Sequence, residues 1–110
     1  MPGTLYIVST PIGNLKDITI RALDVLKNCD YILAESSART AKLLHEYNIE
    51  KKIITFNKDN EKKKKDSVLA DLSEGLKISL VTDAGTPLIS DPGYELTRII
   101  DKSVNLVPIP

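Results

Sequence analysis

The sequence predicts an α/β fold, a Rossmann-like three-layer sandwich built on a mainly parallel sheet of about five strands. Two observations lead to this prediction. Short, continuous apolar runs recur along the chain, as expected for strands that are covered on both faces. Helical patterns separate these runs, and a regular alternation of strands and helices predicts parallel strands joined by right-handed crossovers. The five predicted strands are Leu5–Val8, Tyr31–Ala34, Ile53–Phe56, Ile78–Val81 and Asn105–Val107.

Each segment between the strands carries one apolar stripe at helical spacing. A stripe of this kind predicts an amphipathic helix that packs its apolar side on the sheet. In chain order the four stripes are Ile18, Ala22, Val25, Leu26 and Cys29; Thr40, Leu43, Leu44 and Tyr47; Val68, Leu69 and Leu72; and Leu96, Ile99 and Ile100.

Length and composition set limits on the class of protein. A chain of 110 residues is one domain by the usual length rule. The formal net charge is zero, so composition gives no electrostatic argument for nucleic acid or membrane as a partner. Cys29 is the single cysteine, which excludes an internal disulfide framework and any multi-cysteine metal site. We expect a cytoplasmic protein with no membrane segment, because no apolar stretch approaches about 20 residues and no signal segment opens the chain.

The loops that leave the strands differ from the loops that lead into them. Those leading in are short and plain, whereas those leaving are long and rich in Pro, Gly, Ser and charge. Ligands of open α/β sheets bind outside the carboxyl ends of the strands. We therefore predict a binding site on the rim formed by residues 9–17, 35–39, 57–65 and 82–92. The chain ends at Val107–Pro110 on this same rim, so we expect it to be one half of a longer protein.

The loop "TDAGTPLISDP" after the fourth strand is the strongest candidate for ligand binding. Asp91 and Pro92 form a good helix start, as N-cap and first helical residue. Asp83 lies just past the strand, where a carboxylate can accept hydrogen bonds from a ribose or an ammonium group. Gly85 allows close approach of the backbone to a ligand, and Pro87 stiffens the loop. On the strength of its location we favour a ligand loop over an elaborately capped turn.

The first two loops carry weaker signals. Pro11 and Gly13 suggest a tight turn near the rim, but one glycine does not make a dinucleotide fingerprint, and no Walker A sequence is present. Glu35 follows the second strand, where Rossmann-like proteins often hold a ribose, and either a ligand contact or a solvent-facing charge fits it. Ser36 or Ser37 is expected to cap the next helix.

Three further features have structural interpretations. His45 has no second His or Cys at ligand spacing, so we expect a surface or boundary histidine and no metal site. Cys29 fits the buried stripe and is expected to be a structural thiol. The run Lys62–Lys65 is interpreted first as the solvated start of a helix, although lysines at a helix N-terminus are mildly unfavourable to helix stability. The alternative is that these lysines attract RNA phosphate.

Four stretches together resemble a known family. The sequences "STPIGNLKDIT", Asn60-Glu61, "LVTDAGTPLISDPG" and the terminal "VPIP" are similar, in the same order, to the ribosomal RNA small subunit methyltransferase I family. That family belongs to the tetrapyrrole-methylase superfamily. The resemblance covers the N-terminal domain of a typical member, so residues 1–110 are expected to form that domain, with the C-terminal domain absent from this chain.

The resemblance implies methyl transfer from S-adenosylmethionine to the ribose 2′-hydroxyl of a cytidine in 16S rRNA, by a homodimer. It places Pro11 and Gly13 near the cofactor cleft. The main cofactor contacts from this half of the protein would come from Asp83, Ala84, Gly85, Thr86 and Pro87. Methyl transfer is an in-line displacement, and a base helps a poorly nucleophilic hydroxyl to react. Glu35 is our candidate for that catalytic base.

One departure from the family pattern stands beside these matches. The family usually reads A-E-D-T-R after the second strand, whereas this chain has Ser36 and Ala38 in place of the aspartate and the arginine. Losing this charge pair affects RNA positioning, catalysis or only a local salt bridge. Two alternatives stay open at this point: a methyltransferase for a small molecule such as a tetrapyrrole, and a non-catalytic nucleotide-binding or dimerisation module.

Overall fold

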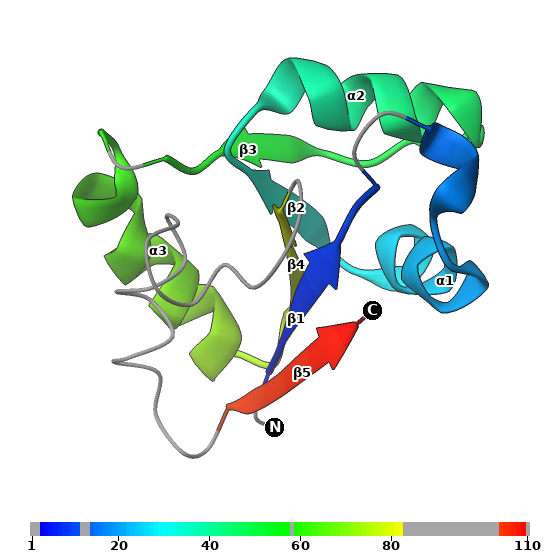
Figure 1. Cartoon of the computed structure of the whole chain (residues 1–110). Helices are drawn as coiled ribbons and strands as arrows, with labels where there is room; N and C mark the ends of the chain where they lie inside the picture. Colours follow the sequence, from blue (N-terminus) through cyan, green and yellow to red (C-terminus); the bar gives the residue numbers. More distant parts are fainter. Residues whose placement is uncertain (1–2, 12–13, 58, 83–103, 110) are drawn as a thin grey trace.

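The computed structural model describes residues 3–11, 14–57, 59–82 and 104–109. They form a five-stranded sheet in which every pairing is parallel, with the strand order β3-β2-β4-β1-β5 (Figure 1). The predicted α/β class and its parallel sheet are thus confirmed. The strands are β1 (Thr4–Ser9), β2 (Tyr31–Ala34), β3 (Ile53–Thr55), β4 (Lys77–Thr82) and β5 (Asn105–Ile109).

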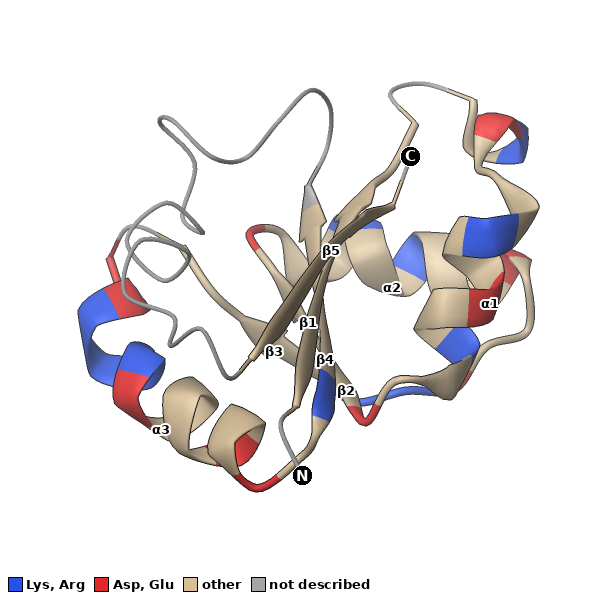
Figure 2. Cartoon of the chain, turned by 90° about the horizontal axis from the view of Figure 1, so that it is seen from below, with Lys and Arg blue, Asp and Glu red and all other residues tan. Residues whose placement is uncertain are grey.

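Helices cover both faces of this sheet. The helices α1 (Ile20–Asn28) and α2 (Ser37–Glu46) lie on one face, and α3 (Glu61–Ser73) lies on the other, which gives the predicted three layers (Figures 1 and 2). A short 3₁₀ helix, η1 (Leu15–Asp17), precedes α1. The fourth predicted stripe, at residues 96–100, lies outside the described residues. In the described ranges no helix is long and apolar enough to cross a membrane.

Alternation along each strand builds two separate cores. On β1, Leu5 and Ile7 face the α3 core, whereas Val8 faces the core shared with α1 and α2. On β2, Leu33 and Ile32 divide in the same way. Side chains that alternate between two buried faces explain why the strands appear in the sequence as continuous apolar runs.

The edge strand β5 is longer than predicted. We expected it to end at Val107, but it continues through Pro108 to Ile109, and among the described strands it pairs with β1 alone. Proline cannot donate a ladder hydrogen bond, so it is tolerated in an edge strand, where one side of the backbone has no partner strand. The strand β3 is one residue shorter than predicted, although the N–H of Phe56 still donates to Ala34 O at 2.8 Å.

Two helices end in the same way, through a residue in the left-handed conformation. Asn48 (φ 56°) follows α2, and Gly75 (φ 95°) follows α3. In each case the next residue, Ile49 or Leu76, donates its backbone N–H to the carbonyl five residues back, at 2.9 and 3.1 Å. This is the Schellman motif, which satisfies terminal carbonyls and buries the apolar residue that follows the turn. The two stops return the chain toward β3 and β4.

Gly3 leads into β1 at a point where no side chain fits. A Cβ atom there would lie 2.5 Å from the carbonyl oxygens of Leu72 and Leu76. The N–H of Gly3 donates to Leu72 O at 2.8 Å, and its carbonyl accepts from Asn105 N at 3.0 Å. The close approach therefore ties the start of β1 to the end of α3 and to the start of β5.

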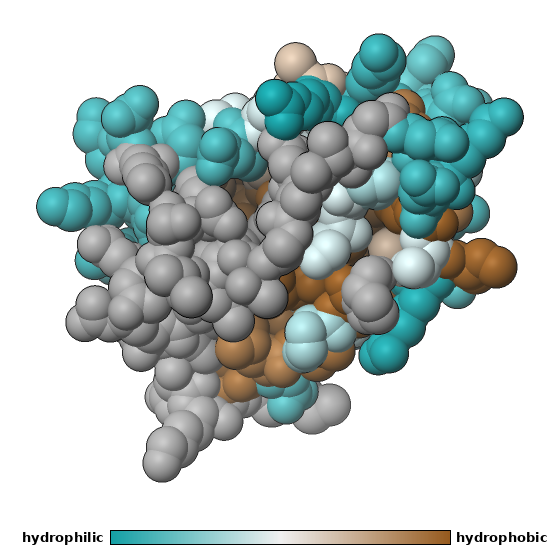
Figure 3. Space-filling model, in the orientation of Figure 1, coloured by the Kyte–Doolittle hydropathy of each residue, from teal (hydrophilic) through white to brown (hydrophobic). Residues whose placement is uncertain are grey.

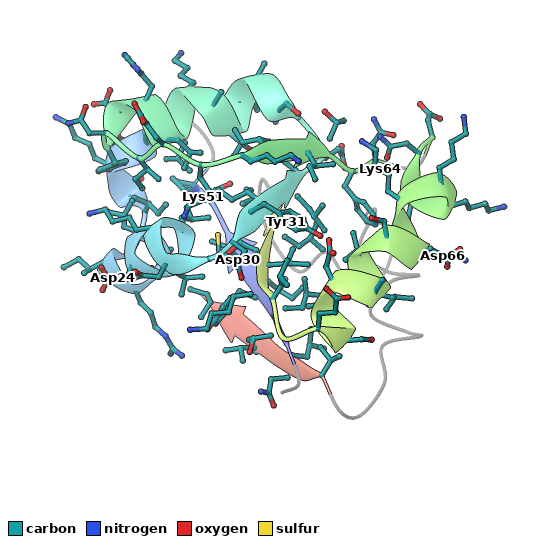
Figure 4. All side chains as sticks on the ribbon, turned by 180° about the vertical axis from the view of Figure 1, so that it is seen from behind. Asp24, Asp30, Tyr31, Lys51, Lys64 and Asp66 are labelled. Carbon is teal, nitrogen blue, oxygen red and sulfur yellow. The ribbon has the colours of Figure 1, made fainter. Side chains whose placement is uncertain are left out.

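Side chains fix the amino edge of the sheet around β2. The carboxylate of Asp30 accepts from the N–H of Lys77 at 2.7 Å, and the N–H of Asp30 donates to Lys77 O at 2.6 Å, which sets the register of β2 against β4. Next to it, the Tyr31 hydroxyl donates to the Asp71 carboxylate on α3 at 2.7 Å (Figure 4 labels Asp30 and Tyr31). Burial raises the pKa of Tyr31 well above its usual range, and the bond to Asp71 raises it further.

We expect Tyr31→Phe to lower the free energy of unfolding by about 1 kcal/mol at neutral pH, because one partly buried hydrogen bond is lost. The folded protein holds the phenol proton more tightly than the unfolded chain does. The stabilisation is therefore complete below pH 10, the ordinary pKa of tyrosine, and is lost as the pH rises above it. Urea unfolding of both proteins between pH 7 and pH 11 measures this. A difference in free energy of unfolding between the two proteins that does not shrink above pH 10 would contradict the hydrogen bond from Tyr31 to Asp71.

Candidate functional site

The carboxyl ends of the three central strands lie side by side. Ser9 at the end of β1 is paired with Thr82 at the end of β4, and Ala34 at the end of β2 is paired with Val81. On the outer side of β2, Ala34 is also paired with Thr55 of β3. The loops that follow these strands therefore start from one continuous rim, as the sequence predicted.

The predicted site residues that the structure describes lie on this rim. Pro11 is half-buried two residues after β1, and Glu35 is exposed directly after β2. Their strands, β1 and β2, are the two neighbours of β4. The other predicted contacts lie outside the described residues: Gly13, Asp83, Ala84, Gly85, Thr86 and Pro87.

The start of α2 fixes the loop that carries Glu35. Ser36 is the N-cap, and its hydroxyl accepts from the N–H of Arg39 at 3.3 Å, which confirms the predicted capping role. Ser37 does not cap; its hydroxyl instead forms a short hydrogen bond with the hydroxyl of Thr55 at the end of β3. Ser and Asp are equally good N-caps, so the serine found where the family pattern has aspartate preserves the capping function.

Thr55 is the point where three elements meet on the outer part of the rim. Its carbonyl accepts from Asn60 Nδ2 at 2.9 Å and from Lys64 Nζ at 3.2 Å, while its hydroxyl meets Ser37. We call Ser37, Thr55, Asn60 and Lys64 the Thr55 cluster. It connects the N-termini of α2 and α3 to the last residue of β3.

The Asn60-Glu61 pair, part of the family resemblance, has a structural role in this cluster. Besides its bond to Thr55, Asn60 accepts the N–H of Asn57 through Oδ1 at 2.8 Å, which closes the turn before α3. Glu61 begins α3 and is only 6% exposed. An acidic residue in the first turn of a helix is favourable to the helix dipole. Sequence analysis placed both residues in the family motif but did not identify these contacts.

Two further predictions concern side chains away from the rim. Cys29 is 2% exposed at the end of α1, its thiol donates weakly to Leu26 O at 3.4 Å, and burial raises its pKa, so the predicted structural thiol is confirmed. His45 is exposed on α2, as expected for a surface histidine. Within the part of the chain that the structure describes, no three His, Cys, Asp or Glu side chains gather as metal ligands.

Comparison with known proteins identifies the family. The family model for Tetrapyrrole (Corrin/Porphyrin) Methylases matches residues 4–110. The chain belongs to the tetrapyrrole methylase family. The predicted resemblance to the ribosomal RNA small subunit methyltransferase I family is also confirmed. Proteins of that name from Buchnera aphidicola (Schizaphis graminum) and Escherichia coli O157:H7 are each 50% identical over 109 residues, or 98% of this chain.

Two solved structures share the fold of this chain. Uroporphyrin-III-C-methyltransferase from Thermus thermophilus superposes with a TM-score of 0.74 at 18% identity, over all of this chain and 48% of that one. A diphthine synthase superposes with a TM-score of 0.71 at 15% identity, over 97% of this chain and 43% of that one. The chain spans 38% of the length of the two rRNA methyltransferase relatives.

We expect Lys64→Met to lower the free energy of unfolding by about 1 kcal/mol, because the Thr55 carbonyl loses a charged donor while the apolar stem of the side chain is kept. The matched control is Lys62→Met, at an exposed position in the same helix, which should change stability by less than about 0.5 kcal/mol. Chemical denaturation of the three proteins at one ionic strength gives the comparison. Equal free energies of unfolding for the two variants would contradict the structural role of Lys64.

Proposed function

We propose that residues 1–110 form the N-terminal domain of an S-adenosylmethionine-dependent methyltransferase that modifies the ribose 2′-hydroxyl of a cytidine in 16S rRNA. The observation that carries the proposal is the shared origin of three loops. They leave β2, β4 and β1, which are adjacent strands, at the same edge of the sheet. About half of the residues are identical to those of relatives named as rRNA small subunit methyltransferases.

The cofactor belongs, in this proposal, between the loops after β1 and β4. Ser9 and Thr82 are paired, so Pro11 and Gly13 start from the strand end beside the one that leads to Asp83–Pro87. A crevice at the carboxyl ends of adjacent strands is the usual ligand site of an open α/β sheet. Backbone shaped by proline and glycine reaches a ligand with little loss of conformational freedom. When bound, S-adenosylmethionine supplies a methyl group on a positively charged sulfur.

Glu35 is the proposed catalytic base. It is exposed at the end of β2, on the other side of β4 from the Pro11 loop, and the capped start of α2 fixes its backbone. The carboxylate accepts the proton of the 2′-hydroxyl as the ribose oxygen forms its bond to the methyl carbon. Bound S-adenosylmethionine would supply the methyl group and would keep the electron pair of its carbon–sulfur bond on sulfur, so charge and atoms would balance. Alignment of oxygen, carbon and sulfur would contribute much of the rate enhancement.

The remaining parts of the proposal concern the whole protein. Because the chain spans 38% of the relatives' length, we propose that a C-terminal domain completes the cofactor cleft. The active protein is then a cytoplasmic homodimer that acts on the small ribosomal subunit or on its RNA. A site divided between two domains excludes water when the domains meet over the bound cofactor.

A chimera tests the proposed reaction. We expect this chain, continued by the residues that follow the matched region in the Escherichia coli O157:H7 relative, to transfer tritiated methyl groups to unmodified small subunits. Nuclease digestion and chromatography should recover 2′-O-methylcytidine. The 110-residue chain alone should show little or no turnover, since it supplies half of the cleft. Robust turnover by the chain alone, or methylation of a tetrapyrrole in preference to RNA, would contradict the proposal.

In the same chimera, two substitutions should have different effects. Glu35→Gln is expected to lower kcat about 100-fold or more, because the catalytic base is lost. The Kd for S-adenosylmethionine should not change, because the substitution removes no contact with the cofactor. Asp83→Ala should raise that Kd about tenfold, measured by calorimetry, because a charged hydrogen-bond acceptor is lost. Glu46→Gln, at an exposed position on α2, is the matched control. A normal kcat for Glu35→Gln would exclude Glu35 as the base.

A further inference from the structure

The loop that carries Glu35 is held by its neighbours and not by Glu35 itself. Glu35 is exposed, and its carboxylate forms no hydrogen bond or ion pair with another residue in the described part of the chain. The residue before it, Ala34, ends β2, and its carbonyl accepts the N–H of Phe56 at 2.8 Å. The residue after it, Ser36, caps α2. The position of Glu35 therefore depends on how firmly the start of α2 is attached to the sheet.

One side-chain hydrogen bond attaches the first turn of α2 to the sheet. The hydroxyl of Ser37, the first residue of α2, bonds to the hydroxyl of Thr55, the last residue of β3. Thr55 is also paired with Ala34 across the two strands. The bond therefore joins a point two residues after Glu35 to the residue opposite the one before Glu35. It closes a small ring that contains Glu35 and Ser36.

Thr55 is itself held from the start of α3. Its carbonyl accepts from Asn60 Nδ2 at 2.9 Å and from Lys64 Nζ at 3.2 Å (Figure 4 labels Lys64). The carbonyl and the hydroxyl of Thr55 thus have separate partners, and the hydroxyl is the group that meets Ser37. The backbone to which Ser37 is bound is therefore fixed independently of α2.

The bond between Ser37 and Thr55 lies where water reaches it. Both residues are half-buried, and in Figure 3 the side chains of the visible face over α2 and the start of α3 are mostly hydrophilic. A hydroxyl that loses its partner there is able to bond to water instead, which avoids the cost of a buried unpaired polar group. Removing one of the two hydroxyls should therefore loosen the Glu35 loop without unfolding the domain.

We infer that Ser37 is a positioning residue for the proposed reaction: its bond to Thr55 holds Glu35 where the carboxylate reaches the ribose 2′-hydroxyl. This inference rests on the proposed function, because it names how the proposed base is kept in place. A base must lie within hydrogen-bond reach of the proton that it accepts, and a displacement of about 1 Å slows a reaction strongly. Ser37 acts through Glu35 and accepts no proton itself.

The test uses the chimera of this chain with the Escherichia coli O157:H7 continuation. Ser37→Ala removes the hydroxyl but keeps the Ser36 cap, and alanine is the better helix former, so the domain should stay folded. We expect kcat to fall roughly tenfold, with an unchanged KM for RNA and an unchanged Kd for S-adenosylmethionine. Ser37→Thr keeps a hydroxyl and should restore kcat. The matched control is Ser67→Ala, at an exposed position on α3, which should leave kcat unchanged.

A second substitution shows whether Ser37 and Thr55 act through one bond. Thr55→Val removes the hydroxyl but keeps the β-branched shape and the carbonyl that Asn60 and Lys64 bind. Alone it should also lower kcat roughly tenfold. The double variant Ser37→Ala/Thr55→Val should again lose roughly tenfold, since the second change has no bond left to break. A loss of roughly a hundredfold would mean that the two residues act independently, and it would overturn the inference.

Amide hydrogen exchange in the 110-residue chain tests the attachment without the reaction. The N–H of Phe56, bonded to Ala34 O, should exchange about fivefold faster in Ser37→Ala than in the unaltered chain. An unchanged exchange rate would overturn the inference whatever the chimera does. A normal kcat for the Ser37→Ala chimera would also overturn it and leave the proposed function in place. No methyl transfer by the unaltered chimera would instead reject the proposed function, and the positioning role with it.

Discussion

The insertion of β4 between β1 and β2 is the constraint on which the rest of the structure depends. The chain forms β1 and β2 first and returns later to fill the position between them. The inserted strand must pack on both faces, which Leu80 and Val81 do by contributing to opposite cores. Because the described strands are all parallel, the same insertion places Thr82, the last residue of β4, between the strands that lead to Pro11 and to Glu35.

The outer part of the rim is held by polar contacts as well as by the packing of Ile53, Ile54 and Phe56. β3 is a three-residue edge strand, and short edge strands leave backbone groups without strand partners. The carbonyl of its last residue, Thr55, is instead satisfied by Asn60 and Lys64 from α3. Fixing the start of α3 to β3 also fixes where the exposed lysines lie. One side chain of the lysine run, Lys64, therefore serves the fold, whereas Lys62 and Lys63 are exposed.

The departure from the family pattern after β2 has a specific structural outcome. Ser36 caps α2, as an aspartate at that position would, and Ala38 is exposed. The local backbone that presents Glu35 is therefore kept while the charge pair is lost. In the proposed function, the charge of this rim comes from Glu35 and from α3.

The sequence by itself determined the local elements of this protein. Continuous apolar runs predicted every strand within two residues at each end, and apolar stripes predicted α1, α2 and α3, because periodicity reflects which faces a segment buries. Sequence also located the rim, since parallel strands present their carboxyl ends together. Only the tertiary structure decided the strand order, the extension of β5 through Pro108, and contacts such as Tyr31 with Asp71, which are 40 residues apart. Periodicity along a chain contains no information about which distant polar groups meet; the packing of helices on the sheet decides that.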